Sequence, residues 1–448
     1  MEVPNAQSEG AVHARVSRRW RGLGAILFLG FYSLYFAAHV RLSDTVVYLK
    51  DDALSSARTS MVFTDLITAR SDERGLSGSA HPLFTLFHQP AAQLAILGWE
   101  RLSQGTNSAR KHAVAVLTAG AGALTVLLLY QTLLWTGVSM GRSVLAAAIQ
   151  GGSTMAAVWA AVPEVWVFCG LGLMAMLWAV ARGRSGRWWE LPLAVVYAVG
   201  CWAWLVIPAV FLLLMAEFRA GKLSSWFGRL FSVLGSLAVI VSALLALNTL
   251  QRVLYPRVIN GFEVAALQEE MEIVSAGVQP EAWSRERVRR LIQSAGFTAV
   301  VAPEAVVKER TPGKAGPVRR SVSFQDDRWL QMDFHHAVWG AWALLLVLGL
   351  GGLPVMARHA PGMVLALLGV VAFVAAFLLF YRVELDRFLF GSLVTPILVA
   401  VVGIGLEGAV RFWRGLALPV GLLTLVFLGA QMTRNWQLVL ELDSMLKL

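Results

Sequence analysis

Residues 361–380 read PGMVLALLGVVAFVAAFLLF, a stretch of twenty residues without one charged side chain. A helix rises about 1.5 Å per residue, so this stretch would measure about 30 Å, the thickness of a bilayer's hydrocarbon core. In lipid, a single segment can satisfy its own backbone hydrogen bonds only as a helix. The stretch is therefore typical of a transmembrane helix.

Ten further apolar segments extend this pattern along the chain. Two of them adjoin within 191–217, which would measure about 40 Å as one helix and contains Gly200 and Pro208, so we predict two short helices there. The predicted fold class is an all-α polytopic membrane protein with about eleven transmembrane helices. The ten segments are 22–40, 112–134, 142–161, 164–181, 191–203, 204–217, 226–250, 336–353, 388–407 and 415–432.

The composition supports a membrane protein and excludes several other classes. Of the 448 residues, 57% are hydrophobic and 15% are charged, against about 25% charged in soluble domains. A disordered chain, a coiled coil and an ordinary cytosolic enzyme are excluded. The only cysteines, Cys169 and Cys201, lie in apolar stretches, which excludes a disulfide framework. The net charge is +10 without a basic stripe interleaved with aromatic residues, so we expect no nucleic-acid partner.

Basic residues in the short loops predict the orientation. Arginines crowd the residues before the first span, which places the N-terminus in the cytoplasm. That span is longer than the apolar run of a signal peptide, so we expect it to stay uncleaved. If 191–217 formed a single helix, every later loop would change sides, and four basic residues beyond it would lie in the cytoplasm. With two helices six basic residues lie there, which favours two helices. The residues expected inside are Arg15, Arg18, Arg19, Arg21, Arg182, Arg184, Arg187, Arg219, Lys222, Arg229, Arg358, Arg411 and Arg414.

The predicted organisation alternates membrane modules with outer regions. Helices are expected near 51–69 and over 81–99, the latter lying at the membrane interface, and also over 263–275 and 281–295, whereas 303–323 is expected to be a loop. The parts are a cytoplasmic N-terminus (1–21), an N-terminal transmembrane module (22–250) that includes an outer loop (41–111), an extracytoplasmic region (251–335), C-terminal transmembrane helices (336–432) and a C-terminal tail (433–448).

Acidic residues at the outer ends of the predicted helices are the main candidates for chemistry. Asp51 and Asp52 follow the first span, and Glu164 lies in the Pro163-Glu164 turn between two others. One interpretation is structural, because acids cap helix N-termini and favour the positive end of the helix dipole. The other is catalytic: a partly desolvated carboxylate can act as a general base on a hydroxyl group or ligate a divalent metal ion.

Cationic side chains and one histidine form a second set of candidates. Arg382 and Arg387 lie in an outer loop, where they either snorkel to the headgroups or bind the phosphate of a lipid-linked substrate. Arg58 is a further candidate in the first outer loop. His81, which precedes Pro82, is either a substrate contact or an ordinary interfacial histidine.

The order of these features resembles the GT-C superfamily of membrane glycosyltransferases, which includes protein mannosyltransferases and lipid A aminoarabinose transferases. One basic-flanked span leads to the acidic pair in DDALSSAR (51–58), then His81-Pro82 opens an apolar interfacial helix, and the Pro163-Glu164 turn follows. The resemblance covers 1–220 and, weakly, 380–400. The chain departs from it in having Asp51-Asp52 where many members have Asp-Glu, and His81 where they have lysine.

The resemblance implies a GT-C-like fold and an enzyme of the cell envelope, placed in the bacterial inner membrane. Its donor would be a sugar on polyprenyl phosphate, and its acceptor a glycan, lipid or protein, with or without a divalent metal ion. Asp51, Asp52 and Glu164 would be catalytic, and Arg58, His81, Arg382 and Arg387 would bind substrate.

Two other functions fit an apolar chain of this kind. A lipid or glycan transporter or flippase needs a polar path across the bilayer, whereas the predicted spans hold almost no central charges. A non-catalytic assembly protein of the cell envelope would use 251–335 as its docking surface.

Overall fold

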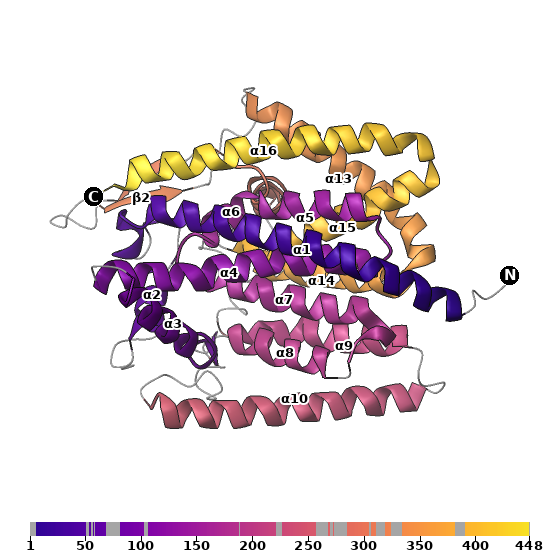
Figure 1. Ribbon diagram of the computed structural model, residues 1–448, viewed down its shortest axis with the longest axis horizontal. Helices are drawn as coiled ribbons and strands as arrows, with labels where there is room; N and C mark the ends of the chain where they lie inside the picture. The colour runs from indigo at the N-terminus through magenta and orange to yellow at the C-terminus, as the bar shows by residue number, and fades with distance from the viewer. Residues whose placement is uncertain are drawn as a thin grey trace.

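The structure is a computed structural model, and its long helices lie side by side along one axis, with the two chain termini at opposite ends (Figure 1). One sheet of two strands is the only sheet in the part of the chain that is described. The structure describes residues 6–50, 53–54, 57, 59–68, 81–102, 106–187, 189–220, 226–256, 268, 272, 285–303, 306–310, 319–323, 334–380 and 390–447.

Seven described helices are long and apolar enough to cross a membrane, and three shorter apolar helices accompany them. This confirms an all-α polytopic membrane protein. The seven spans are Trp20–Leu42 in α1 (Ala6–Leu42), Ser108–Trp135 in α4 (Thr106–Trp135), Phe227–Leu254 in α10 (Trp226–Leu254), Ala337–His359 in α13 (Phe334–His359), Pro361–Leu379 in α14 (Pro361–Phe380), Gly391–Phe412 as α15 and Arg414–Leu446, which covers η8 (Arg414–Leu416) and α16 (Ala417–Leu446).

The shorter apolar helices include the two predicted within 191–217. The chain breaks at Trp202, between α8 (Glu190–Cys201) and the short turn η3 (Ala203–Leu205) that leads into α9 (Val206–Ala220). The third is α7 (Trp166–Arg182), which ends in the turn η2 (Gly183–Ser185). The predicted split of this apolar stretch is therefore confirmed.

The core lies around α15, whose apolar residues are nearly all buried, whereas α10 forms one edge of the bundle. Close packing of α15 with α13 depends on glycine. A Cβ atom on Gly352 or Gly405 would collide with the backbone of the other helix, so only glycine permits this approach. The pair α13 and α15 therefore forms the tightest seam described in the bundle.

The prediction of one helix over 142–161 was wrong. The segment forms α5 (Met140–Gly151) and α6 (Thr154–Trp159), separated at Gly152 and Ser153. The Ser153 hydroxyl accepts a hydrogen bond from the Ala156 amide (3.3 Å) and so starts a new helix. Such a break is hard to recognise in an apolar sequence, because the buried Ser153 hydroxyl forms its hydrogen bond within the same segment.

Two other boundaries differ from the prediction. The expected tail 433–448 is helical as far as Leu446, because Leu438, Val439 and Leu442 continue the buried face of α16. The helix expected near 51–69 begins only at Thr59, as α2 (Thr59–Ile67). The helix expected over 81–99 is present as α3 (Phe84–Glu100), and it carries the exposed Leu94 and Leu97.

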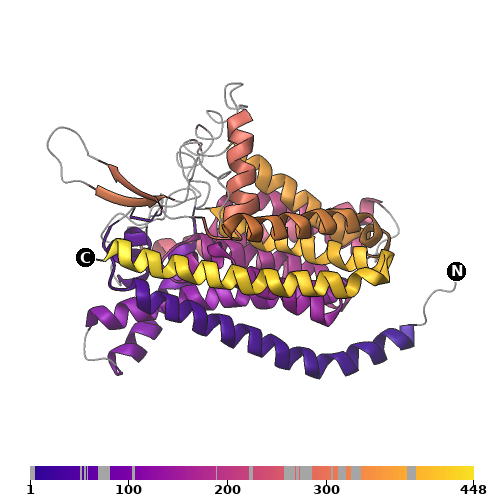
Figure 2. The same ribbon diagram turned by 90° about the horizontal axis from the view of Figure 1, so that it is seen from above.

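The region 251–335 contains a hairpin where a loop was expected. Strands β1 (Val306–Arg310) and β2 (Arg319–Ser323) pair antiparallel, with Val307 opposite Val322. The side chain of Val322 is buried. The helix expected over 281–295 appears as α12 (Arg285–Leu291) followed by the π-helix η5 (Ile292–Thr298), which stand across the bundle axis (Figure 2). Apart from residues 268 and 272, the helix expected over 263–275 lies outside the described residues.

Residues 299–303, which we call the strap, dock this region into the break between α5 and α6. The amides of Thr154 and Met155, which begin α6, donate to the strap carbonyls of Val300 (3.2 Å) and Ala299 (3.1 Å). Residues 299–302 are completely buried. The strap therefore satisfies amides that the helix break would otherwise leave without partners.

Candidate functional site

The structure describes two of the seven predicted site residues, Glu164 and His81. Asp51, Asp52, Arg58, Arg382 and Arg387 lie outside the described residues. Their described sequence neighbours nevertheless have defined surroundings, which we use below.

Glu164 lies in the turn between α6 and α7 and is 2% exposed. Its Oε1 accepts a hydrogen bond from the Val165 amide (2.9 Å) at the start of α7. This contact differs from the capping bond that the structural interpretation predicts, because Val165 itself precedes α7 and no side chain caps the amides of the first turn. The same location also meets the condition for catalysis, because the carboxylate is withdrawn from bulk water at a helix N-terminus.

His81 belongs to the same neighbourhood. Its Nδ1 donates to the carbonyl oxygen of Cys201 (2.7 Å), which also lies within 3.8 Å of the Cys169 Sγ. The His81 ring meets the Trp166 ring edge-on at 5.7 Å. Since Trp166 and Cys169 lie in the first turn of α7, the structure brings His81 to the same helix end as Glu164.

An aromatic cluster connects this helix end to described residues near both ends of 381–389, the segment that contains Arg382 and Arg387. The Trp166 ring contacts Phe390 (4.5 Å between ring centroids), and Phe390 contacts Phe377 (5.3 Å). Phe377 lies in the last turn of α14 and Phe390 directly precedes α15, so described residues on both sides of 381–389 pack beside α7. The aromatic cluster therefore brings the end of α14 and the start of α15 to the same end of α7 as Glu164.

A buried hydrogen-bond network connects the acidic-pair segment to the Glu164 turn. The Tyr48 hydroxyl, in η1 (Val46–Tyr48), donates to the carbonyl of Ala161 (3.4 Å) and lies 2.5 Å from His39 Nδ1. His39 Nε2 in turn contacts His112 Nδ1 (3.1 Å). Burial raises the pKa of Tyr48 well above its usual value, so the hydroxyl stays protonated. Tyr48 lies three residues before Asp51, and Ala161 lies three residues before Glu164.

The sequence did not single out His39, Tyr48 or His112. The one sequence feature that could have indicated them is a polar ring next to an apolar stretch. His39 and Tyr48 lie on either side of the end of the first span. Their contacts join α1, η1, α4 and the Glu164 turn. Such long-range pairing is not visible in the spacing of residues along one chain segment.

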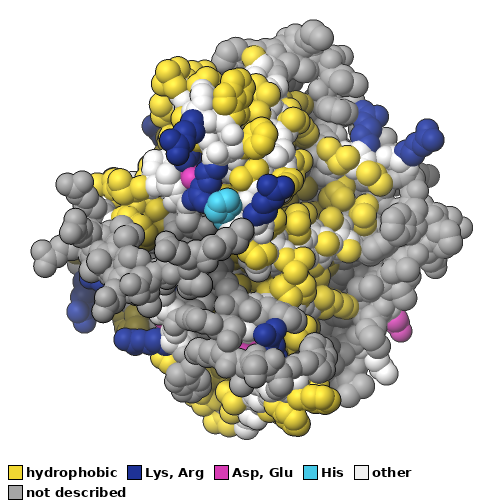
Figure 3. Space-filling view, turned by 90° about the vertical axis from the view of Figure 1, so that its right-hand side faces the viewer, with side chains coloured by type: hydrophobic (Ala, Val, Ile, Leu, Met, Phe, Trp, Pro, Cys, Tyr) yellow, Lys and Arg dark blue, Asp and Glu magenta, His cyan; other side chains and the backbone are white. Residues whose placement is uncertain are grey.

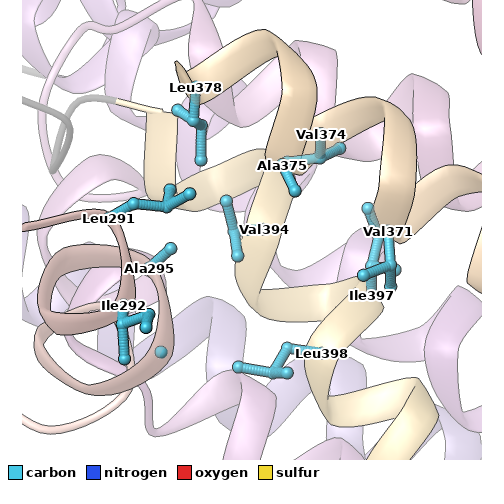
Figure 4. Close-up of a pocket in the computed structure, with 11 residues that line it drawn as sticks. Leu291, Ile292, Ala295, Val371, Val374, Ala375, Leu378, Val394, Ile397 and Leu398 are labelled. Carbon is cyan, nitrogen blue, oxygen red and sulfur yellow. The ribbon is translucent and has the colours of Figure 1, made fainter. Parts of the chain in front are cut away.

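An apolar groove of about 210 Å³ opens between α14, α15 and the α12–η5 segment (Figure 4). Its lining side chains are all aliphatic. Leu378 of α14 and Val394 of α15 lie close in sequence to the two ends of the 381–389 loop. The opposite wall comes from Leu291, Ile292 and Ala295. A groove of this kind accommodates a hydrocarbon chain and offers no partner to a polar one.

No metal centre is formed by the residues that are described, since none of them make a group of three or more His, Cys, Asp or Glu suited to a metal ion. His81 donates its Nδ1 proton to a carbonyl, which leaves Nε2 as its other ring nitrogen. The chemistry of the described part therefore rests on a carboxylate, an imidazole and an apolar groove.

The opposite end of the bundle is basic and held by ion pairs. Arginine and lysine side chains gather on the end that faces the viewer in Figure 3. Buried Glu407 binds Arg142 (2.6 Å) and Arg411 (2.9 Å), and Arg411 also donates to the carbonyl of Gly137. Arg182 pairs with Glu190 (2.5 Å). These contacts fix helix ends remote from the candidate site.

Comparison with known proteins gives no assignment: neither a protein-family model nor a curated protein matches the chain.

Proposed function

We propose that this chain is a membrane glycosyltransferase that moves a sugar from a polyprenyl-phosphate donor to a lipid, glycan or protein acceptor at the outer face of the membrane. The observation that supports it most directly is the Tyr48–Ala161 contact (3.4 Å). It joins the segments that lead to Asp51 and to Glu164, the two acidic positions that the GT-C resemblance singles out. Two carboxylate-bearing segments meeting at one end of the bundle suit a one-sided reaction.

The groove supports a donor with a hydrocarbon chain. It runs along α14 and α15, whose connecting loop contains Arg382 and Arg387. A polyprenyl chain in this groove would place its phosphate toward the arginine-bearing loop. Arginine is suited to this role because its guanidinium group binds phosphate oxygens in a bidentate manner.

The proposed reaction is an inverting displacement. Asp51 accepts the proton of the acceptor hydroxyl as its oxygen forms a bond to the anomeric carbon of the sugar. The bond from that carbon to the phosphate oxygen breaks, and the polyprenyl phosphate leaves with the electron pair. Arg382 and Arg387 stabilise the charge on the departing phosphate. Asp52 and Glu164 complete the acidic environment, with or without a divalent metal ion.

The same proposal assigns the orientation. The basic end in Figure 3 would face the cytoplasm, because basic residues collect on that side of a membrane. The end with Glu164 and His81 would then face outward, and we place the protein in the bacterial inner membrane.

Asp51→Asn tests the proposal. We expect the rate of sugar transfer to fall about 10²–10⁴-fold, because an amide cannot accept the hydroxyl proton. The assay supplies a panel of radiolabelled polyprenyl-phosphate sugars to membranes containing the protein and follows label into lipid, glycan and protein fractions. Expression and membrane insertion should remain normal.

Asp44→Asn is the matched control. It makes the same chemical change seven residues earlier, on a carboxylate that is 88% exposed and 3.9 Å from Lys111. We expect this variant to retain full transfer. Wild-type transfer by Asp51→Asn would refute the catalytic assignment, and no transfer by the wild-type protein from any donor of the panel would refute the proposed function.

A further inference from the structure

Four arginines, which we call the arginine cluster, lie at the basic end of the bundle. Arg358 belongs to the last turn of α13 and Arg411 to the last turn of α15. Arg414 begins η8, the turn that joins α15 to α16, and Arg142 lies in the first turn of α5. These arginines come from segments that are far apart in the sequence, so their position depends on how the helices pack.

The seam between α13 and α15 brings two of these helix ends together. Gly352 of α13 lies against Gly405 of α15, and one turn further along both helices Met356 lies against Gly408. The contacts advance in the same direction on the two helices, which are therefore parallel. Their last turns, and with them the arginines of α13 and α15, lie side by side.

One carboxylate pairs with this cluster among the described residues. Glu407 binds Arg142 (2.6 Å between Nη2 and Oε2) and Arg411 (2.9 Å between Nε and Oε1). Arg358 and Arg414 are exposed and have no acidic partner in the described part of the chain. Four arginines against one carboxylate leave a surplus of three positive charges.

Exposed apolar side chains adjoin the cluster. Phe412 is 82% exposed and Trp413 is 61% exposed, and both lie between Arg411 and Arg414 in the sequence. Leu418, in the first turn of α16, is exposed as well. Figure 3 shows basic and hydrophobic side chains next to one another on this end of the molecule. Such a mixture suits the level of the lipid headgroups, where aromatic rings have one apolar and one polar surrounding.

Two helices lead away from the cluster with apolar side chains exposed. α13 ends there and carries the exposed Val347, and α16 begins there and carries the exposed Leu422. The two helices pack together where the rings of Trp342 and Phe427 stack, 5.5 Å between centroids. A hydrocarbon chain can therefore follow either helix from the cluster into the membrane.

Two ordinary roles account for arginines at helix C-termini without a ligand. Such arginines interact favourably with the helix dipole, and they mark the cytoplasmic ends of spans. Arg411 serves the first role and also donates to the carbonyl of Gly137. Neither role requires Phe412 and Trp413 to be exposed beside the charges. A ligand that has both an anionic and an apolar part makes use of both features.

We infer that the arginine cluster binds the phosphate group of an anionic phospholipid, whose acyl chains lie along the exposed sides of α13 and α16. Guanidinium groups suit this ligand because they bind phosphate oxygens through paired hydrogen bonds. A zwitterionic phospholipid would bring an ammonium group to a cluster that already has surplus positive charge, so the anionic lipid is preferred. This binding is independent of the proposed sugar transfer.

Binding of fluorescent phosphatidylglycerol to the full-length protein in a non-ionic detergent tests the inference, with phosphatidylcholine of the same acyl chains as the comparison. We expect the wild type to prefer phosphatidylglycerol, and the preference should shrink as salt is added. The double variant Arg358→Gln, Arg414→Gln should bind phosphatidylglycerol at least about tenfold more weakly, because each cation at a membrane surface contributes about fivefold.

Two further variants separate charge at this site from charge in general. Arg358→Lys with Arg414→Lys keeps the charge and should keep the preference for phosphatidylglycerol. Arg41→Gln with Arg101→Gln removes two exposed arginines that follow the apolar parts of α1 and α3, and it should leave binding unchanged. Thermal unfolding of each variant identifies any loss of binding that comes from loss of the fold.

Four outcomes would overturn the inference. The first two are equal binding of both lipids by the wild type, and unchanged binding of phosphatidylglycerol by the folded glutamine variant of the cluster. The third is an equal loss of binding in the control variant at Arg41 and Arg101, which would show a general effect of net charge. The fourth is displacement of the lipid by an equal concentration of inorganic phosphate, which would assign the cluster to a water-soluble phosphate.

Discussion

His88 on α3 shows how a single buried side chain joins three helices. Its Nδ1 donates to the carbonyl of Phe84 (2.9 Å), so Nε2 accepts from the Tyr197 hydroxyl (3.1 Å). The ring also packs on Phe168 at 4.1 Å. Burial lowers the pKa of His88 to about 4, against a smaller opposing effect of the Phe84 carbonyl. The neutral imidazole is therefore the form that joins α3 to α7 and α8.

His88→Gln should flatten the pH dependence of stability. Between about pH 6.5 and pH 4 the unfolded chain binds a proton at His88 that the folded chain does not, so stability is lost as the pH falls through this window. The shift corresponds to at most about 3 kcal/mol. Thermal unfolding in detergent from pH 7.5 to pH 4 measures the effect. His359→Gln, on an exposed histidine, should follow the wild type, and an equally steep loss in His88→Gln would contradict the prediction.

At the scale of elements, α16 holds the strap through buried amides. Asn435 Nδ2 donates to the carbonyls of Gly152 (2.6 Å) and Val300 (2.9 Å), while its Oδ1 accepts from Ala302 (2.7 Å). Gln431 adds a bond to Val300 (3.0 Å). The strap thus builds part of the region 251–335 into the helix bundle at the break between α5 and α6.

Asn435→Ala should destabilise this junction by about 3 kcal/mol, because it leaves buried backbone groups of the strap without partners. The free energy of unfolding and the rate of proteolysis between residues 285 and 333 measure the change. Thr433→Ala is the matched control, since the exposed Thr433 bonds only to the Gly429 carbonyl of its own helix among the described contacts. Identical proteolysis of both variants would show that the strap is held by other contacts.

The elements differ in how far the sequence predicted them, for physical reasons. The break at Trp202 was predictable because a helix over 191–217 would exceed the membrane thickness. The break at Gly152 was not, because 142–161 has the length of one span and its broken backbone is satisfied by Val300, far away in the sequence. The hairpin was missed because proline and glycine at its turn dominated the pattern, although Val306 and Val307 favour a strand.

At the scale of the whole molecule, topology accounts for what the sequence predicted of the candidate site. Counting spans placed Glu164 and His81 at one end, and both lie at the start of α7. The His39–Tyr48 contact and the strap were missed, because buried polar pairs between distant segments leave no periodic signal. The predicted roles of Asp51 and the arginines of the 381–389 loop stay predictions that the transfer assay decides.

The placement of the termini makes a prediction about the molecule in a membrane. They lie at opposite ends of the bundle, and a bridge between Thr45 and Lys447 holds the end of α16 beside the Leu42 end of α1. Cysteines introduced at Asp44 and Lys447 should therefore react from one side of the membrane, and a cysteine at Ser185, in the exposed turn after α7, from the other.

An impermeant maleimide applied to intact cells and to permeabilised cells measures the side. Wild-type protein is the blank, because Cys169 and Cys201 are completely buried. We expect positions 44 and 447 to label in intact cells and position 185 only after permeabilisation; labelling of 185 and 447 from the same side would mean that the bundle does not cross the bilayer along its helix axes.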